Sequence, residues 1–147
     1  LEVQLAEADR LGRPISCLML DVDHFKRFND QFGHDAGDAV LRALGKILLT
    51  LTREHGLAFR FGGEEFAILL PHTSEQDARD VAERVREAIA AIRVDGGEKE
   101  LRVTTSCGVA TFLPKEAPQA WLARADEALY RAKHQGRNCT RVFATIS

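Results

Sequence analysis

Short apolar runs alternate along the chain with longer stretches in which apolar residues recur every three or four positions. The short runs are typical of buried β-strands, and the recurring pattern predicts helices with one apolar face. Strands are expected at residues 15–20, 57–61, 66–70, 101–112 and 139–146. Helices are expected at residues 1–11, at 24–33, after Gly37, after Gln76 and around 121–132. This order predicts an α+β fold, with a mixed sheet and helices on one face, of ferredoxin-like or palm-like type.

Turn and cap residues support these boundaries. Gly62 and Gly63 separate two strand-like runs and predict a tight hairpin, because such turns need positive φ. Residues 73–76 read T-S-E-Q, which fits a capping box at the start of the fourth expected helix. Gly136 follows the last helix and is a favourable C-terminal cap.

Three carboxylates are placed where a metal ion could bind. Asp21 follows a buried strand, and Glu64 and Glu65 lie at the tip of the expected hairpin. If the hairpin pairs with the first strand, these groups converge at one end of the sheet, and Mg²⁺ favours one or two carboxylates plus substrate phosphates. Successive strand residues point to opposite faces, so Glu64 and Glu65 are expected to differ in role. The alternatives are that the glutamates are solvated surface residues and that the Asp-x-Asp pattern at residues 21–23 is a helix cap.

Composition narrows the function classes. The 147 residues fit one domain, 45% of them are hydrophobic, and the net charge is −2. The absence of a basic excess argues against a nucleic-acid-coating protein, so any phosphate site must be local. The three cysteines form no C-x-x-C pair, which indicates reduced thiols and a cytoplasmic location. No apolar run has the length of a membrane span.

Three separated motifs resemble the GGDEF domain family of diguanylate cyclases. Residues 60–66 read R-F-G-G-E-E-F, and residues 21–38 read D-V-D-H-F-K-R-F-N-D-Q-F-G-H-D-A-G-D. Residues 125–138 read A-D-E-A-L-Y-R-A-K-H-Q-G-R-N. The resemblance implies a central antiparallel sheet surrounded by helices, similar to polymerase palms and nucleotide cyclases. It also implies condensation of two GTP molecules into cyclic di-GMP, with release of two pyrophosphates.

The family pattern implies a metal site. Asp21 and Glu64 would hold Mg²⁺, with Mn²⁺ as an alternative ion, the Val22 carbonyl as a further ligand and Glu65 assisting. Glu64 is also the family's candidate catalytic residue, accepting the proton of the attacking hydroxyl. A metal-bound carboxylate is a weak base, so we favour its role as a ligand.

The same pattern implies a guanine site. Asn29 and Asp38 match the family's base-binding pair, and a carboxylate at position 38 can accept from guanine N1–H and N2, which favours GTP over ATP. His34 lies in the same stretch. A nucleotide contact and a capping or core role remain equally open for it.

Further residues would bind phosphate. Lys26, Lys133 and Arg137 match phosphate-contacting cations, although each alone is more typical of a solvated side chain. Lys133 and Arg137 are four residues apart and are expected to share a helix face.

Backbone groups would complete this phosphate site. The amides near His24 and Phe25 are expected to lie at a helix N-terminus, where they can bind an anion. Gly62 and Gly63 would let the backbone approach the nucleotide closely.

Two departures from the family pattern stand out. The inhibitory product site R-x-x-D is replaced by Arg53 to Gly56, which lacks the carboxylate, so weak or absent product inhibition is expected. The family's opening D-x-L-T-G-L-x-N-R-R segment does not precede Leu1, so residues 1–147 are expected to form an N-terminally truncated domain.

Several partners follow from the resemblance. Turnover needs two GTP-loaded sites, so a homodimer is expected, together with an upstream sensory or receiver domain in the parent protein. A non-catalytic nucleotide-binding module and a palm-like domain acting on nucleic acid are the other function classes. The retained carboxylates argue against the first and the charge balance against the second.

Overall fold

The computed structural model describes residues 12–144, except 54–55, 61–63 and 96–99. Its main sheet contains β1 (Ile15–Val22), β2 (Leu57–Arg60), β3 (Glu65–Pro71), β6 (Thr105–Thr111) and β7 (Thr140–Val142). Their order is β2-β3-β1-β6-β7, with β7 parallel to β6 and every other pair antiparallel. The sheet is therefore mixed, as the element order predicts, and its antiparallel part is central.

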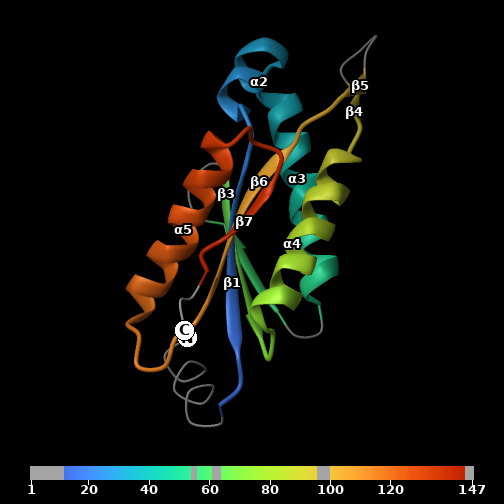
Figure 1. Ribbon diagram of the computed structural model, residues 1–147. Helices are drawn as coiled ribbons and strands as arrows, with labels where there is room; N and C mark the ends of the chain where they lie inside the picture. The colour runs from blue at the N-terminus through green and yellow to red at the C-terminus, as the bar shows by residue number, and fades with distance from the viewer. Residues whose placement is uncertain (1–11, 54–55, 61–63, 96–99, 145–147) are drawn as a thin grey trace.

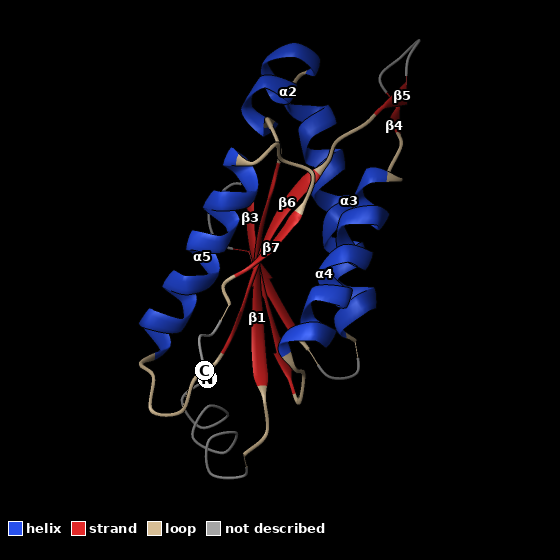
Figure 2. Cartoon of the chain, in the orientation of Figure 1, coloured by secondary structure: helices blue, strands red, loops and turns tan. Residues whose placement is uncertain are grey.

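Helices cover both faces of this sheet (Figures 1 and 2). On one face lies α5 (Pro118–His134), and on the other lie α3 (His34–Thr52) and α4 (Glu75–Ala90). The expectation of helices on one face is wrong, because β1 is apolar on both of its sides. Cys17 and Met19 pack toward α5, while Leu18 and Leu20 join the core under α3 and α4.

The remaining elements lie at the end of the sheet where β1 ends. Helix α2 (Phe25–Phe32) begins three residues after β1, and the short strands β4 (Val94–Asp95) and β5 (Glu100–Leu101) form a separate antiparallel pair. Figure 1 shows the end of β1, the start of α2 and the end of α5 together at this end of the molecule. The fold therefore brings two of the three motif segments, 21–38 and 125–138, into one region.

Glycines set how closely α5 approaches the sheet and where it stops. A Cβ added at Gly108 in β6 would lie 2.2 Å from the Ala125 carbonyl oxygen, so α5 rests directly on the strand backbone. At the other end, Gly136 has φ +117° and the Arg137 amide donates to the Ala132 carbonyl, which is a Schellman-type ending. The predicted glycine cap is confirmed.

Two local predictions need adjustment. The N-cap of α4 is Ser74, whose hydroxyl accepts from the Asp77 amide at 3.2 Å, so the cap lies one residue later than the capping-box pattern suggests. Strand β6 starts at Thr105, four residues after the expected start. The helix expected over 1–11 lies outside the described residues.

Two further findings concern the apolar parts of the chain. Cys17 and Cys107 are fully buried thiols, and burial raises the pKa of each to about 12. Among the described helices, none is both long and apolar enough to cross a membrane.

Candidate active site

Asp21 lies at the end of β1, where one neighbouring side chain is a carboxylate and the other is an ammonium group. In the antiparallel register it stands directly across from Glu65 of β3, so the two side chains share the α5 face of the sheet. The Lys133 ammonium, from the last turn of α5, donates to Asp21 Oδ2. Glu64, one residue before β3, is half-buried. The structure thus brings three predicted residues together from β1, β3 and α5.

The Asp21 carboxylate is held in an unfavourable electrostatic setting. Burial raises its pKa above the ordinary value for Asp, and the neighbouring Glu65 and Asp23 raise it further. Lys133 opposes this shift by its hydrogen bond and charge without cancelling it. The carboxylate therefore has room for more positive charge than Lys133 alone provides.

These donors fit a magnesium ion, although they do not enclose one. In the part of the chain that the structure describes, no group of three or more His, Cys, Asp or Glu side chains could hold a metal. Mg²⁺ in nucleotide-processing sites takes one or two carboxylates and fills its shell with phosphates and water. The carboxylates of Asp21 and Glu65 match that donor set. The raised pKa of Asp21 also indicates that a cation here would stabilise its ionised form. Asp23 does not join it, because both its oxygens accept hydrogen bonds from protein groups.

The predicted guanine pair lies on the two helices at the same end of the molecule. Asn29 is on α2, and its Oδ1 is buried with no hydrogen-bond partner. A Cβ at Gly37 of α3 would lie 1.8 Å from that oxygen, so the glycine provides the space the amide occupies. Asp38 is the next residue and is exposed. A buried acceptor without a partner is costly, which suits a site that a donor-rich ligand completes.

His34 is the first residue of α3 and is exposed. Its exposure excludes the core alternative, and the N-cap of α3 is Gly33 with no side-chain cap, which excludes the capping alternative. Its contact with a nucleotide stays a prediction.

The start of α2 leaves amides available to an anion. His24 is the N-cap, with φ +55°, and no side chain caps this helix. The first amides of a helix lack intrahelical partners and attract phosphate. The ring of Phe25 is buried and stacks on Phe28, so only the backbone of Phe25 can serve a ligand here.

The two cations at the end of α5 are placed differently. Lys133 is in the helix, but Arg137 lies beyond its last residue, with φ +59°. The expectation that they share a helix face is wrong, because the glycine cap turns the chain between them. Arg137 and Lys26 are exposed, with no ion-pair partner among the described residues. Gly62 and Gly63 lie outside those residues.

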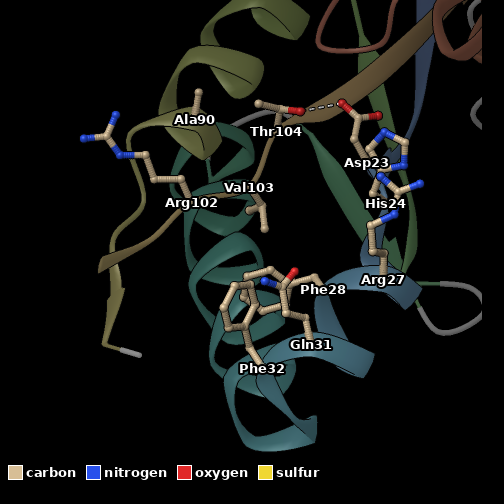
Figure 3. A pocket seen from close by; sticks show the side chains of 10 residues that line it. All are labelled: Asp23, His24, Arg27, Phe28, Gln31, Phe32, Ala90, Arg102, Val103 and Thr104. Atoms are coloured by element: carbon tan, nitrogen blue, oxygen red, sulfur yellow. Dashed lines mark hydrogen bonds between the residues drawn. The ribbon is translucent and has the colours of Figure 1, made fainter. Parts of the chain in front are cut away.

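A cavity of about 470 Å³ opens between α2 and residues 102–104 (Figure 3). The rings of Phe28 and Phe32 line it, with Thr104 and Asp23 on the strand side. Of the described residues that the sequence assigns to phosphate, only His24 lines this cavity, and none of the described metal or guanine candidates does. The cavity therefore adjoins the predicted phosphate contact at the start of α2 and is separate from the predicted metal and guanine contacts.

Known proteins resemble this chain over most of its length. A family model described as "Diguanylate cyclase, GGDEF domain" matches residues 1–139. Diguanylate cyclase DgcP of Pseudomonas aeruginosa is 46% identical over 138 residues, which cover 94% of the chain and 21% of DgcP. Response regulator PleD of Caulobacter vibrioides is 45% identical over 130 residues, 86% of the chain and 29% of PleD. The chain thus spans less than a third of either relative.

Solved structures agree. The GGDEF domain of DgcB from Caulobacter crescentus, in complex with c-di-GMP, superposes with a TM-score of 0.93 at 32% identity. The match covers 99% of this chain and 86% of that domain. The two folds therefore correspond over nearly all of their elements.

Proposed function

Because the chain belongs to the GGDEF domain family of diguanylate cyclases, we propose that it condenses two GTP molecules into cyclic di-GMP and releases two pyrophosphates. The observation that carries the proposal is the meeting of Asp21, Glu65 and Lys133 at the end of β1. Two carboxylates and one cation there match the needs of a metal-bound triphosphate. The whole chain, 1–147, is proposed to form one such domain.

In this proposal Asp21, Glu64, Glu65 and the Val22 carbonyl hold Mg²⁺, or Mn²⁺ in its place. The metal, when bound, neutralises the triphosphate and lowers the pKa of the attacking 3′-hydroxyl. Glu64 is the candidate acceptor of the hydroxyl proton, with metal ligation as its favoured role. Metal binding would free Lys133 from Asp21, so that its ammonium can contact phosphate instead.

The remaining residues bind and orient the nucleotide. Lys26, Arg137, the first amides of α2 and the backbone of Gly62 and Gly63 contact the phosphates. Asn29 Oδ1, which is buried without a partner, and the Asp38 carboxylate accept from the N–H groups of guanine. Adenine lacks N1–H and N2–H donors, and this loss at a site built to accept them favours GTP. His34 lies close enough in the chain to contact the same nucleotide.

Partners are proposed from the chemistry and from the relatives. Two GTP-loaded sites must face each other, so we propose a homodimer as the working form. One relative is named a response regulator, which supports an upstream receiver or sensory domain in the parent protein.

The test is a comparison of the wild-type chain with Glu64→Gln at high protein concentration, with GTP and Mg²⁺. Wild type should form cyclic di-GMP and pyrophosphate. Glu64→Gln should lose at least about a hundredfold in turnover, because metal-assisted charge stabilisation contributes several kcal/mol, while its circular dichroism stays unchanged. Equal turnover in the two proteins would contradict the assigned role of Glu64. Absence of product from wild type would contradict the proposed activity of this chain.

A further inference from the structure

Asp23 is buried beside the candidate site, yet its carboxylate is taken up by protein groups. We propose that Asp23 is a positioning residue, which fastens residues 136–138 after α5 and thereby sets Arg137 for the phosphates. The inference rests on the proposed function. It concerns a residue that the sequence analysis assigned no role.

Three donors converge on the Asp23 carboxylate. The Ser106 hydroxyl donates to Oδ1 at 2.6 Å, and the Thr104 hydroxyl donates to Oδ2 at 2.6 Å (Figure 3). The Asn138 amide donates to the same Oδ2 at 2.9 Å. Asp23 is only 7% exposed; its bond with Ser106 is buried, and its bonds with Thr104 and Asn138 are partly buried. Charge-assisted bonds of this kind are stronger than neutral ones.

The segment that Asp23 holds has an unfavourable backbone. Arg137 has φ +59° and Asn138 has φ +46°, two successive non-glycine residues in the left-handed region. Such residues persist only where surrounding contacts over-determine them. Besides the bond that its backbone amide donates to Asp23, Asn138 accepts at its side-chain oxygen from Arg86 of α4 at 3.0 Å. The turn is thus bonded to Asp23, just after β1, and to Arg86 of α4.

Asp21, in β1, and Asp23, just after it, each bind a residue near the end of α5. Asp21 binds Lys133, before the helix end, and Asp23 binds Asn138, after it. Arg137 lies between these two ties. Loss of the Asp23 tie leaves the left-handed turn freer to relax, and Arg137, which lies in that turn, would lose its fixed position relative to Asp21.

A metal-ligand role for Asp23 makes a different prediction from a positioning role. Asn at position 23 keeps one oxygen, which can accept from Thr104 and Asn138, and its amide can donate to Ser106. Asp23→Asn therefore preserves the tie but removes the charge. Asp23→Ala removes both. Only a positioning role predicts rescue by Asp23→Asn.

The experiment measures the protection of the turn and the affinity for nucleotide separately. Hydrogen exchange of the Asn138 amide is followed by NMR in wild type, Asp23→Ala and Asp23→Asn, and the affinity of each for GMPCPP with Mg²⁺ and for guanosine is titrated. In Asp23→Ala, exchange should accelerate and GMPCPP affinity should fall, each by about tenfold, because a hydrogen bond to a charged group is lost. Guanosine affinity should stay within about twofold, since that ligand lacks phosphates. Asp23→Asn should stay within about threefold of wild type in all three measurements.

A matched control and a substitute variant complete the design. Thr104→Val removes one donor to Asp23 and leaves the Asn138 bond, so exchange at Asn138 should change little. If Asp23→Ala does not fold, Asp23→Ser replaces it, because its side chain is too short to reach the turn.

Two results would overturn the inference while leaving the proposed function intact. One is unchanged protection of the Asn138 amide in Asp23→Ala; the other is GMPCPP binding as weak in Asp23→Asn as in Asp23→Ala. Failure of wild type to bind GMPCPP would instead contradict the proposed function, and would overturn the phosphate-positioning half of the inference with it.

Discussion

The two ends of the candidate nucleotide site are built in opposite ways. At the phosphate end, buried polar groups already have partners: Asp21 is paired with Lys133, and Asp23 accepts three hydrogen bonds. At the base end, Asn29 Oδ1 is buried without a partner, and Asp38 is exposed. Satisfied networks fix geometry, whereas an unsatisfied acceptor is stabilised only when a ligand arrives. On the proposed function, the Asp23 network at the phosphate end is preformed and the Asp21–Lys133 pair opens when metal binds, whereas guanine would complete the base end.

The largest effect is expected from removing the charge at the phosphate end. Asp21→Asn should lower turnover at least about a hundredfold, because a carboxylate ligand to the metal is lost. The folded state of Asp21→Asn should nevertheless be more stable than that of the wild type. The raised pKa of Asp21 means that the folded state binds the proton more tightly, so the ionised carboxylate destabilises the fold at neutral pH.

Thermal unfolding without Mg²⁺ checks the second half of this prediction. Asp21→Asn should unfold at a higher temperature than wild type at pH 7. The difference should shrink as the pH falls through the raised pKa of Asp21, and it should vanish below the ordinary pKa of Asp, where both proteins carry an uncharged group at this position. A lower midpoint for Asp21→Asn at pH 7 would show that the Lys133 pair outweighs burial.

A smaller effect is expected at the base end. Gly37→Ala places a methyl group where Asn29 Oδ1 lies, and the amide must move because it is the flexible partner. Affinity for GTP should fall by about tenfold, since one or two hydrogen bonds to guanine are lost. Calorimetric titration with GMPCPP and Mg²⁺ measures this.

Gly45→Ala is the matched control in the same helix. Nothing lies within 4 Å of a Cβ at that position. The substitution should leave nucleotide affinity unchanged and stabilise α3 by about 0.5–1 kcal/mol through the better helix propensity of alanine. Equal loss of nucleotide affinity in Gly37→Ala and Gly45→Ala would contradict a role for Asn29 in guanine binding.

The smallest effect is expected away from both ends. Arg53, at the end of α3, is exposed, and Gly56 brings no carboxylate near it. Cyclic di-GMP added to the assay should inhibit turnover weakly, and Arg53→Ala should change that inhibition by less than about twofold, as exposed polar contacts contribute little. Strong inhibition that Arg53→Ala abolishes would show that this position binds product without the aspartate.

Local sequence signals predicted much of the fold and part of the site. The apolar runs located β1 and β3, and the position of Gly136 predicted the end of α5. The resemblance to the GGDEF family is confirmed by the family match. The element order alone missed helix coverage of both sheet faces, although the unbroken apolar run of β1 was a signal for it and the family resemblance implied it. In addition, α5 ends before Arg137, so spacing alone could not place its side chain.

The contacts of Asp23 could not be predicted from local pattern. Thr104, Ser106 and Asn138 lie 81, 83 and 115 residues away in the chain, and only the sheet order brings them to β1. The D-x-D spacing was the one available signal, and it does not distinguish a metal ligand from a residue that binds a distant turn.

The most direct test of the central claim is product analysis of the wild-type chain at high concentration with Mg²⁺ and either GTP or ATP. The account predicts cyclic di-GMP and pyrophosphate from GTP, and no cyclic dinucleotide from ATP. Products from both nucleotides at similar rates would contradict guanine recognition by Asn29 and Asp38. Absence of product from GTP would contradict the proposed diguanylate cyclase activity of this chain.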